Sequence, residues 1–196
     1  MKNVVLTGIG GQGTVLAAKV LAQAAQNRGW QVRTAETIGM AQRGGSVVSH
    51  VRMGDCGEQV HAPLVSAGQA DALIAFEPGE AARVAHLLKP EGVLVSASRV
   101  VQPVTASLSK EVYEARPVIE ALEARSGRTI IVDEAPLLAA VGNPKALNMV
   151  LLATAVQADA IGISLDGLKD AVRACVKPRF VDMNVAAIDE AAAALR

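Results

Sequence analysis

Two glycine-rich segments in the first quarter of the chain hold the residues that could bind an anion. The first fits the pattern G-x-G-x-x-G and directly follows a short run of β-branched and aliphatic residues. Glycines at these positions permit a tight turn, and the N–H groups at the start of the following helix can bind a phosphate. We therefore predict a binding loop made of Gly8, Gly10, Gly11, Gln12, Gly13 and Thr14.

The second segment places Arg43 directly before two glycines. A guanidinium is always charged and forms paired hydrogen bonds with phosphates and carboxylates, and glycines let the backbone expose successive N–H groups. The segment follows the second predicted strand, so it should lie beside the first loop at the carboxyl edge of the sheet. Its candidate binding residues are Gln42, Arg43, Gly44, Gly45 and Ser46. A structural role for Arg43, capping carbonyls or pairing with Glu36, is equally consistent with the sequence.

The glycine pattern alone leaves its ligand open. Glu36 lies 23 residues after Gly13, near the position expected for an acid that binds the ribose of NAD. Alternatively, the glycines serve only close packing, of the helix on the sheet or of another chain on the loop.

Outside these segments the sequence offers little catalytic chemistry. His50, His61 and His86 have no metal-ligand spacing, and Asp133-Glu134 is typical of solvated charges at the start of a helix. G-x-S-x-G, a phosphate-loop lysine and H-E-x-x-H are all missing from the sequence. We therefore assign no catalytic residue and no metal site.

The pattern of apolar residues predicts the elements that position the two loops. Short β-rich runs predict strands over 4–7, 31–35, 47–53, 72–76, 93–97 and 129–132, and helical spacing predicts helices over 11–29, 79–88, 111–125, 145–159, 165–174 and 182–195. Residues 4–36 have the length of a strand–helix–strand unit with parallel strands. We expect one α/β domain over 1–196, with a Rossmann-like, mostly parallel sheet flanked by helices and a helical C-terminal layer.

Composition restricts the class of protein. The chain has 196 residues with 19 basic and 19 acidic side chains, and this neutral charge gives no general attraction to nucleic acid or anionic lipid. Cys56 and Cys175 are too few to hold an iron–sulfur cluster, which normally needs four thiolates. The apolar stretches are shorter than a membrane-spanning helix. We expect a cytoplasmic protein that binds neither nucleic acid nor membranes.

The two loops taken together resemble a known family. Gly-Ile-Gly-Gly-Gln-Gly at 8–13, Met-Ala-Gln-Arg-Gly-Gly at 40–45, Gly142-Asn143 and Asn148-Met149 are similar to the gamma subunit of 2-oxoacid:ferredoxin oxidoreductases. The Met-Ala-Gln-Arg-Gly-Gly segment most resembles that of the small (beta) subunit of indolepyruvate:ferredoxin oxidoreductases.

The resemblance implies a heteromeric enzyme. Such a complex oxidises an aryl 2-oxoacid to an acyl-CoA and CO2 and reduces ferredoxin, with thiamine diphosphate and iron–sulfur clusters on a large partner subunit. This chain would have no cofactor of its own and would contribute to the active-site or coenzyme A interface, with ferredoxin an indirect partner and a homodimer within the complex left open. Two alternatives remain at this point: a free-standing NAD-binding oxidoreductase and an assembly subunit without a ligand.

Overall fold

The computed structural model describes residues 1–39, 44–102, 114–125 and 127–194. Its six strands are β1 (Lys2–Ile9), β2 (Gln31–Ile38), β3 (Ser46–Gly54), β4 (Ala70–Ala75), β5 (Leu88–Ala97) and β6 (Arg128–Val132). The α-helices are α1 (Thr14–Asn27), α2 (Pro78–Val84), α3 (Ala115–Glu123), α4 (Glu134–Val141), α5 (Leu147–Gln157), α6 (Leu165–Cys175) and α7 (Val181–Ala194). Single 3-10 turns lie at Ala85–Leu87, Pro144–Ala146 and Pro178–Phe180.

The strands form one mixed sheet in the order β2-β3-β1-β4-β5-β6. β4, β5 and β6 continue in parallel from β1, whereas β3 pairs antiparallel with both β1 and β2. Five of the six strands therefore run in the same direction, and the α/β fold with a mostly parallel sheet is confirmed.

The first strand–helix–strand unit differs from the expectation in one respect. β2 does not pair with β1, because β3 lies between them. β3 is largely buried, which suits an interior strand, while β2 exposes Arg33, Thr34 and Glu36, and polar side chains are typical of a sheet edge. β2 also extends to Ile38, three residues beyond the predicted end of the strand at residue 35.

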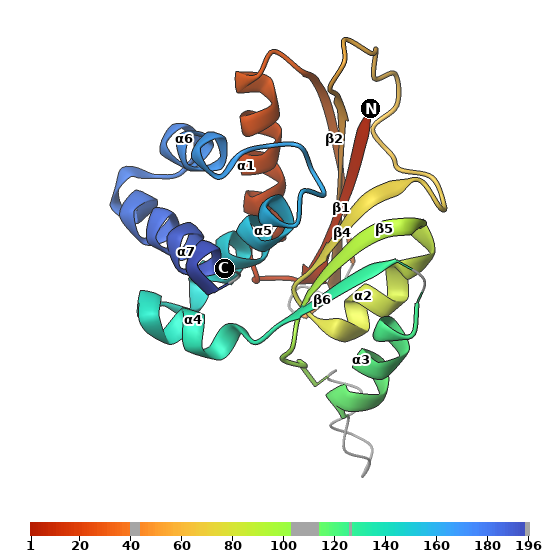
Figure 1. The fold of residues 1–196 in the computed structure, drawn as a ribbon, viewed down its shortest axis with the longest axis vertical. Coiled ribbons are helices and arrows are strands. Elements are labelled where there is room, and N and C mark those ends of the chain that lie inside the picture. Colours follow the sequence, from red (N-terminus) through yellow and green to blue (C-terminus); the bar gives the residue numbers. More distant parts are fainter. Residues whose placement is uncertain (40–43, 103–113, 126, 195–196) are drawn as a thin grey trace.

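Helices cover both faces of the sheet (Figure 1). α1, α5 and the C-terminal helices lie on one face, and α2 and α3 on the other. The centre of the larger layer is α5, whose residues from Asn148 to Val156 are all buried. A helix that is apolar all round must be enclosed by other elements, so the expected helical C-terminal layer is confirmed as part of the same core.

Helical spacing did not predict α4, which directly follows β6, although Asp133-Glu134 was interpreted as the start of a helix. The side chain of Asp133 accepts a hydrogen bond from the Ala135 N–H and caps its start, and Gly142 ends it in the left-handed conformation. No single helix in the described ranges is long and apolar enough to cross a membrane. In those ranges, Glu134–Val141 and Pro144–Gln157 reach the necessary length and apolar character only when taken together, and the chain bends by 119° between them.

Candidate functional site

The first glycine loop joins β1 to α1 at the carboxyl edge of the sheet. Gly11 and Gly13 have φ values of 102° and 87°, in the left-handed region that glycine adopts without strain. Gly13 is the residue before α1, and no side chain caps this helix. The N–H groups of the first turn of α1 are therefore left for another acceptor, as a phosphate-binding loop requires.

Gln12 holds this loop in place. Its Oε1 accepts a hydrogen bond from the Ile9 N–H at 2.7 Å, and its Nε2 donates to the Phe76 carbonyl at 3.1 Å. The side chain thus ties the β1–α1 loop to the residue after β4. Gly8 leaves room for this contact, since a Cβ there would lie 2.7 Å from Gln12 Oε1 and 2.9 Å from Phe76 Cβ.

Gly13 packs against a different element from the one that its motif suggests. The third glycine of such motifs is associated with close approach of helix and strand. Here a Cβ on Gly13 would lie 2.7 Å from Nδ2 of Asn148 on α5, and the same Nδ2 donates to the Gly13 carbonyl at 3.4 Å. The close approach is therefore between the loop and α5.

Thr14 does not face solvent. Its side chain is buried, and its Oγ1 lies 3.2 Å from the position that a Cβ on Gly8 would occupy. Within the described residues this hydroxyl has no hydrogen-bond partner. Direct ligand contact by the Thr14 hydroxyl is untested and remains a prediction.

The second glycine segment lies beside the first, as expected. The Gly10 N–H donates to the Gly45 carbonyl at 2.9 Å, and the Gly39 N–H donates to the Ser46 carbonyl at 2.7 Å. The Ser46 hydroxyl donates to a carboxylate oxygen of Glu80 on α2. Of the predicted binding residues in this segment, Gln42 and Arg43 lie outside the described residues, while Gly44, Gly45 and Ser46 are placed at this edge.

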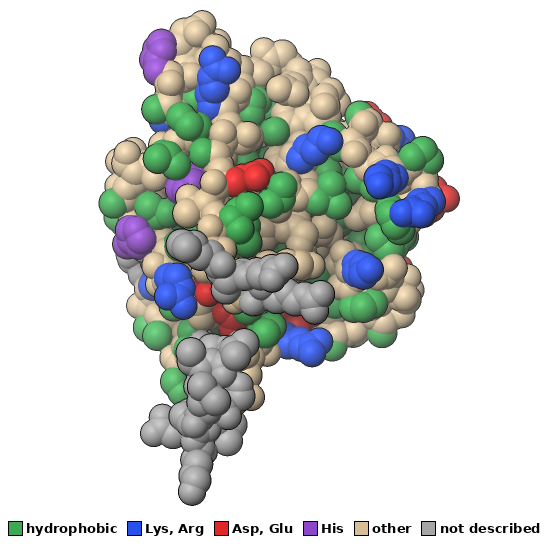
Figure 2. Space-filling model, turned by 180° about the vertical axis from the view of Figure 1, so that it is seen from behind, with side chains coloured by type: hydrophobic (Ala, Val, Ile, Leu, Met, Phe, Trp, Pro, Cys, Tyr) green, Lys and Arg blue, Asp and Glu red, His purple; other side chains and the backbone are tan. Residues whose placement is uncertain are grey.

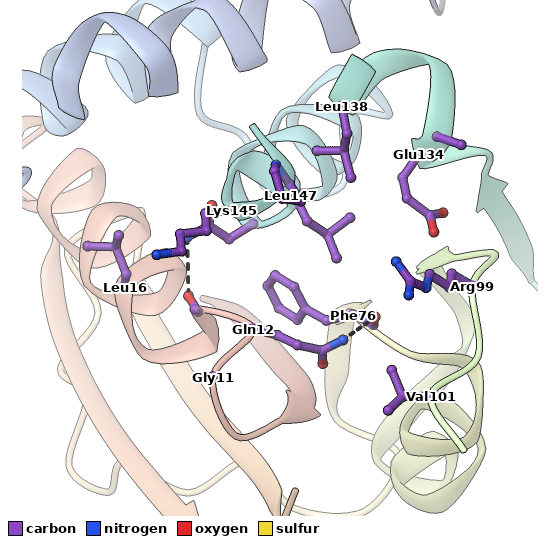
Figure 3. A pocket seen from close by; sticks show the side chains of 14 residues that line it. Gly11, Gln12, Leu16, Phe76, Arg99, Val101, Glu134, Leu138, Lys145 and Leu147 are labelled. Carbon is purple, nitrogen blue, oxygen red and sulfur yellow. Dashed lines mark hydrogen bonds between the residues drawn. The ribbon is translucent and has the colours of Figure 1, made fainter. Parts of the chain in front are cut away.

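A cleft of about 550 Å³ opens over the first loop (Figure 3). Gly11, Gln12, Gly13 and Leu16 form one side. The rest of the wall comes from Phe76 after β4, Arg99 and Val101 after β5, Glu134, Ala135 and Leu138 of α4, and Pro144, Lys145, Leu147 and Asn148. The volume is within the range of small-molecule sites, and mostly apolar walls with a few charged groups are typical of them.

Three charged side chains line the cleft. Lys145 and Arg99 are exposed, whereas Glu134 is only 4% exposed. One carboxylate oxygen of Glu134, Oε2, accepts hydrogen bonds from the N–H and hydroxyl of Ser98, at 3.0 and 3.1 Å. The interpretation of Asp133-Glu134 as solvated helix-start charges is thus right for Asp133, an exposed cap, and wrong for Glu134, which the β6–α4 turn directs inward.

Glu36 is not placed to serve a nucleotide in this cleft. It is exposed on the edge strand β2, opposite Ser49 of β3, which is itself opposite Leu6 of β1. With strands about 4.8 Å apart, Glu36 is about 10 Å from β1. The insertion of β3 therefore separates the expected ribose-binding acid from the glycine loop.

A smaller cavity of about 270 Å³ lies on the α2 side of the loops, next to Ser46. Glu77 lines it, is 3% exposed, and caps α2 by accepting a hydrogen bond from the Glu80 N–H at 2.8 Å. Burial raises the pKa of Glu77 above its ordinary value, while the hydrogen bond from Glu80 N–H opposes that shift. Glu77 therefore favours its neutral form more than an exposed glutamate does.

Comparison with known proteins agrees with the resemblance of the two loops. The family model described as pyruvate ferredoxin/flavodoxin oxidoreductase matches residues 3–194. The chain belongs to this family. It is 36% identical to the indolepyruvate oxidoreductase subunit IorB of Pyrococcus horikoshii over 191 residues, covering 95% of this chain and 92% of that protein. It is 35% identical to the subunit of the same name from Archaeoglobus fulgidus, covering 95% and 91%.

Solved structures show the same fold. The gamma subunit of a keto/oxoacid ferredoxin oxidoreductase from Geobacter sulfurreducens superposes with a TM-score of 0.70 at 24% identity, covering 97% of this chain and 96% of that one. A 2-oxoglutarate:ferredoxin oxidoreductase from Magnetococcus marinus matches with a TM-score of 0.72 at 18% identity, covering 98% of this chain but 30% of that one. The prediction of a gamma-type subunit of the 2-oxoacid oxidoreductases is confirmed, and a free-standing NAD enzyme is not favoured.

The sequence did not predict the other charged residues of the cleft. Arg99 and Lys145 come from two separate connections and are brought to the glycine loop only by the fold. The one available signal was positional, since each follows a strand or a turn at the carboxyl edge.

Proposed function

We propose that this chain is the small subunit of an aryl 2-oxoacid (indolepyruvate-type) ferredoxin oxidoreductase, and that its glycine-loop edge binds coenzyme A and faces the large subunit. The observation that carries this proposal is the cleft beside the uncapped N-terminus of α1, with Lys145 on its rim. Helix N-termini and basic side chains are suited to the pyrophosphate of coenzyme A.

The rest of the reaction belongs to the partner subunit in this proposal. The complex would convert the 2-oxoacid and coenzyme A to an acyl-CoA and CO2 and pass two electrons to ferredoxin, with thiamine diphosphate supplying the decarboxylation chemistry. The cysteines of this chain do not fit an iron–sulfur cluster: Cys56 is an exposed residue after β3, and Cys175 is at the end of α6. This chain would hold and orient coenzyme A at the subunit boundary.

Two further points support the coenzyme A assignment over its rivals. The Magnetococcus marinus structure is described with coenzyme A and succinyl-CoA bound, so coenzyme A is a ligand of an enzyme that contains this fold. NAD is less suitable, because Glu36 is displaced from the cleft by β3.

We also place the protein in the cytoplasm, with ferredoxin as an indirect partner; whether two copies pair in the complex is left to experiment.

The test combines ligand binding with reconstitution. We expect coenzyme A, and not NAD, to raise the melting temperature of the purified chain, by the equivalent of about 2.7 kcal/mol at 100 times its Kd. Affinity purification from the native cell should recover a large iron–sulfur subunit. The isolated chain should be colourless and should not oxidise 2-oxoacids; iron in stoichiometric amount, or turnover without a partner, would contradict the proposal.

A preference for NAD in the same titration would favour the dinucleotide enzyme. Recovery of the large subunit with no response to either ligand would favour an assembly subunit without a ligand.

A further inference from the structure

Glu134 is a fixed hydrogen-bond acceptor in the wall of the cleft. Its carboxyl group is held by Ser98, which donates to Oε2 from both its N–H and its hydroxyl. The other oxygen, Oε1, makes no hydrogen bond to the described residues, and the side chain points into the cleft in Figure 3. Although the side chain as a whole is 4% exposed, Oε1 itself is open to the cleft, so it can accept a hydrogen bond from a ligand there.

The cleft has a distinct character at each end. The N-terminus of α1 and the ammonium of Lys145 form a positive end at the glycine loop. Glu134 lies on the far side, across from that loop, and Arg99 also lines this part, with its guanidinium directed toward the Glu134 carboxylate in Figure 3.

Apolar side chains separate the two ends. Phe76 lies between the glycine loop and Glu134, and Leu147 and Leu138 form the wall above it (Figure 3). A matching ligand has an anionic group at one end, a flat or apolar body in the middle and a hydrogen-bond donor at the other end. An adenine nucleotide with a diphosphate has all three, since its exocyclic amino group donates and its flat base suits an apolar wall. Phe76 is itself only 1% exposed and therefore contributes to this wall without offering a free ring face.

We propose that Glu134 determines the specificity of the cleft by accepting a hydrogen bond from the exocyclic amino group of adenine. This inference rests on the proposed function, because coenzyme A carries such an adenine next to its pyrophosphate. The nucleotide half is anchored on this chain, and the pantetheine arm is left to extend toward the partner subunit, where the reaction takes place.

The proposal requires a hydrogen-bond donor at the position of the adenine amino group. Hypoxanthine has a carbonyl oxygen where adenine has its amino group, so an inosine nucleotide would place an acceptor against the carboxylate. A buried acceptor facing another acceptor loses its hydrogen bond and is repelled. The cleft should therefore reject inosine nucleotides although their phosphates are the same.

The experiment compares ADP and IDP on the full-length chain by isothermal titration calorimetry, with coenzyme A and NAD as further arms. We expect ADP to bind at least about tenfold more tightly than IDP. In Glu134→Gln, whose amide offers a donor as well as an acceptor, the ratio should fall to about one because the affinity for ADP decreases.

Asp133→Asn is the matched control. It removes the same charge one residue away, on an exposed side chain, and asparagine also caps helices well, so the ADP to IDP ratio should not change. The comparison of the two nucleotides on the unmodified chain decides the matter even if Glu134→Gln fails to fold.

The outcomes separate this inference from the proposed function. Binding of coenzyme A with equal affinities for ADP and IDP, or without binding of ADP, overturns the role of Glu134 and leaves the coenzyme A site standing. Binding of NAD in preference to coenzyme A, with ADP still favoured over IDP, keeps the adenine contact and overturns the proposed ligand. If none of the four compounds binds, both proposals fail.

Discussion

The two edges of the sheet differ in how completely their charged groups are matched within the chain. At the amino edge, Asp71 accepts a hydrogen bond from the Asn3 N–H at 2.7 Å and pairs with Lys89. Arg52 there donates to Asn3 Oδ1 at 3.0 Å and to the Ala62 carbonyl at 2.8 Å. These charges are matched by other groups of the same chain.

At the carboxyl edge the polar groups are less completely matched. α1 begins without a side-chain cap, and Lys145 forms no ion pair with the described residues. Figure 2 shows the molecule from behind, where lysine and arginine side chains are spread over the visible face and do not form one patch. Matched charges stabilise the chain itself, whereas unmatched ones are available to a ligand or a partner, so we expect substitutions at the two edges to have different consequences.

The largest effect on assembly is expected from Arg43→Ala. A guanidinium that binds a desolvated anionic group contributes about 2 to 5 kcal/mol to binding, whereas an exposed rim charge contributes about 1 kcal/mol or less. We expect the larger loss, measured by reconstituting the variant with the large subunit and titrating coenzyme A. Unchanged association and affinity, together with a lower melting temperature of the free chain, would instead make Arg43 a structural cap.

The largest effect on stability is expected from Gly13→Leu. A leucine must adopt the left-handed conformation and displace Asn148, so the free energy of unfolding should fall by about 2 to 4 kcal/mol in a urea titration. Gly57→Leu is the matched control in the connection after β3: its φ is 81° and no atom lies within 4 Å of a Cβ there, so its loss should be about 1 to 2 kcal/mol. Equal losses would show that contact with α5 is unimportant.

A smaller effect is expected from Lys145→Ala. Because the side chain is exposed, its loss should weaken coenzyme A binding by about 1 kcal/mol at low salt and by less at high salt. Lys89→Ala, at the amino edge, should lower the stability and leave the affinity unchanged, since Lys89 is paired with Asp71. Equal changes in the affinity for coenzyme A in both variants would show that the two edges of the sheet do not differ in ligand binding.

The smallest effect is expected from Glu77→Gln, which tests the buried carboxyl next to the second loop. Burial raises the pKa of Glu77 above 4.5, so the native state holds this proton more tightly than the unfolded chain does. The neutral carboxyl stabilises the native state fully below pH 4.5, and this stabilisation is lost as the pH rises through the raised pKa. Glutamine stays neutral and still offers an acceptor to the Glu80 N–H, so the variant should melt higher than the unmodified chain at neutral pH and equally well below pH 4.5.

Thermal melts across this pH range provide the measurement. A variant that melts lower at neutral pH would show that the charged carboxylate is the stabilising form.

The local features of this protein were predictable because they depend on short stretches of sequence. Gly11 and Gly13 stand where the backbone takes the left-handed conformation, and β-rich runs and helical periodicity located most elements to within a few residues. The contact between Gly10 and Gly45 followed from a simple rule, that loops after parallel strands meet at one edge of the sheet.

What the sequence did not determine was which distant segments come together. The position of β3 between β1 and β2 is a choice among strand partners, which hydrophobic pattern alone does not make. Glu134 has the sequence context of an ordinary helix-start charge, and only the turn from β6 into α4 and the hydrogen bonds from Ser98 direct it inward. The cleft exists because tertiary packing places five connections around the start of α1, and no single stretch of sequence contains that information.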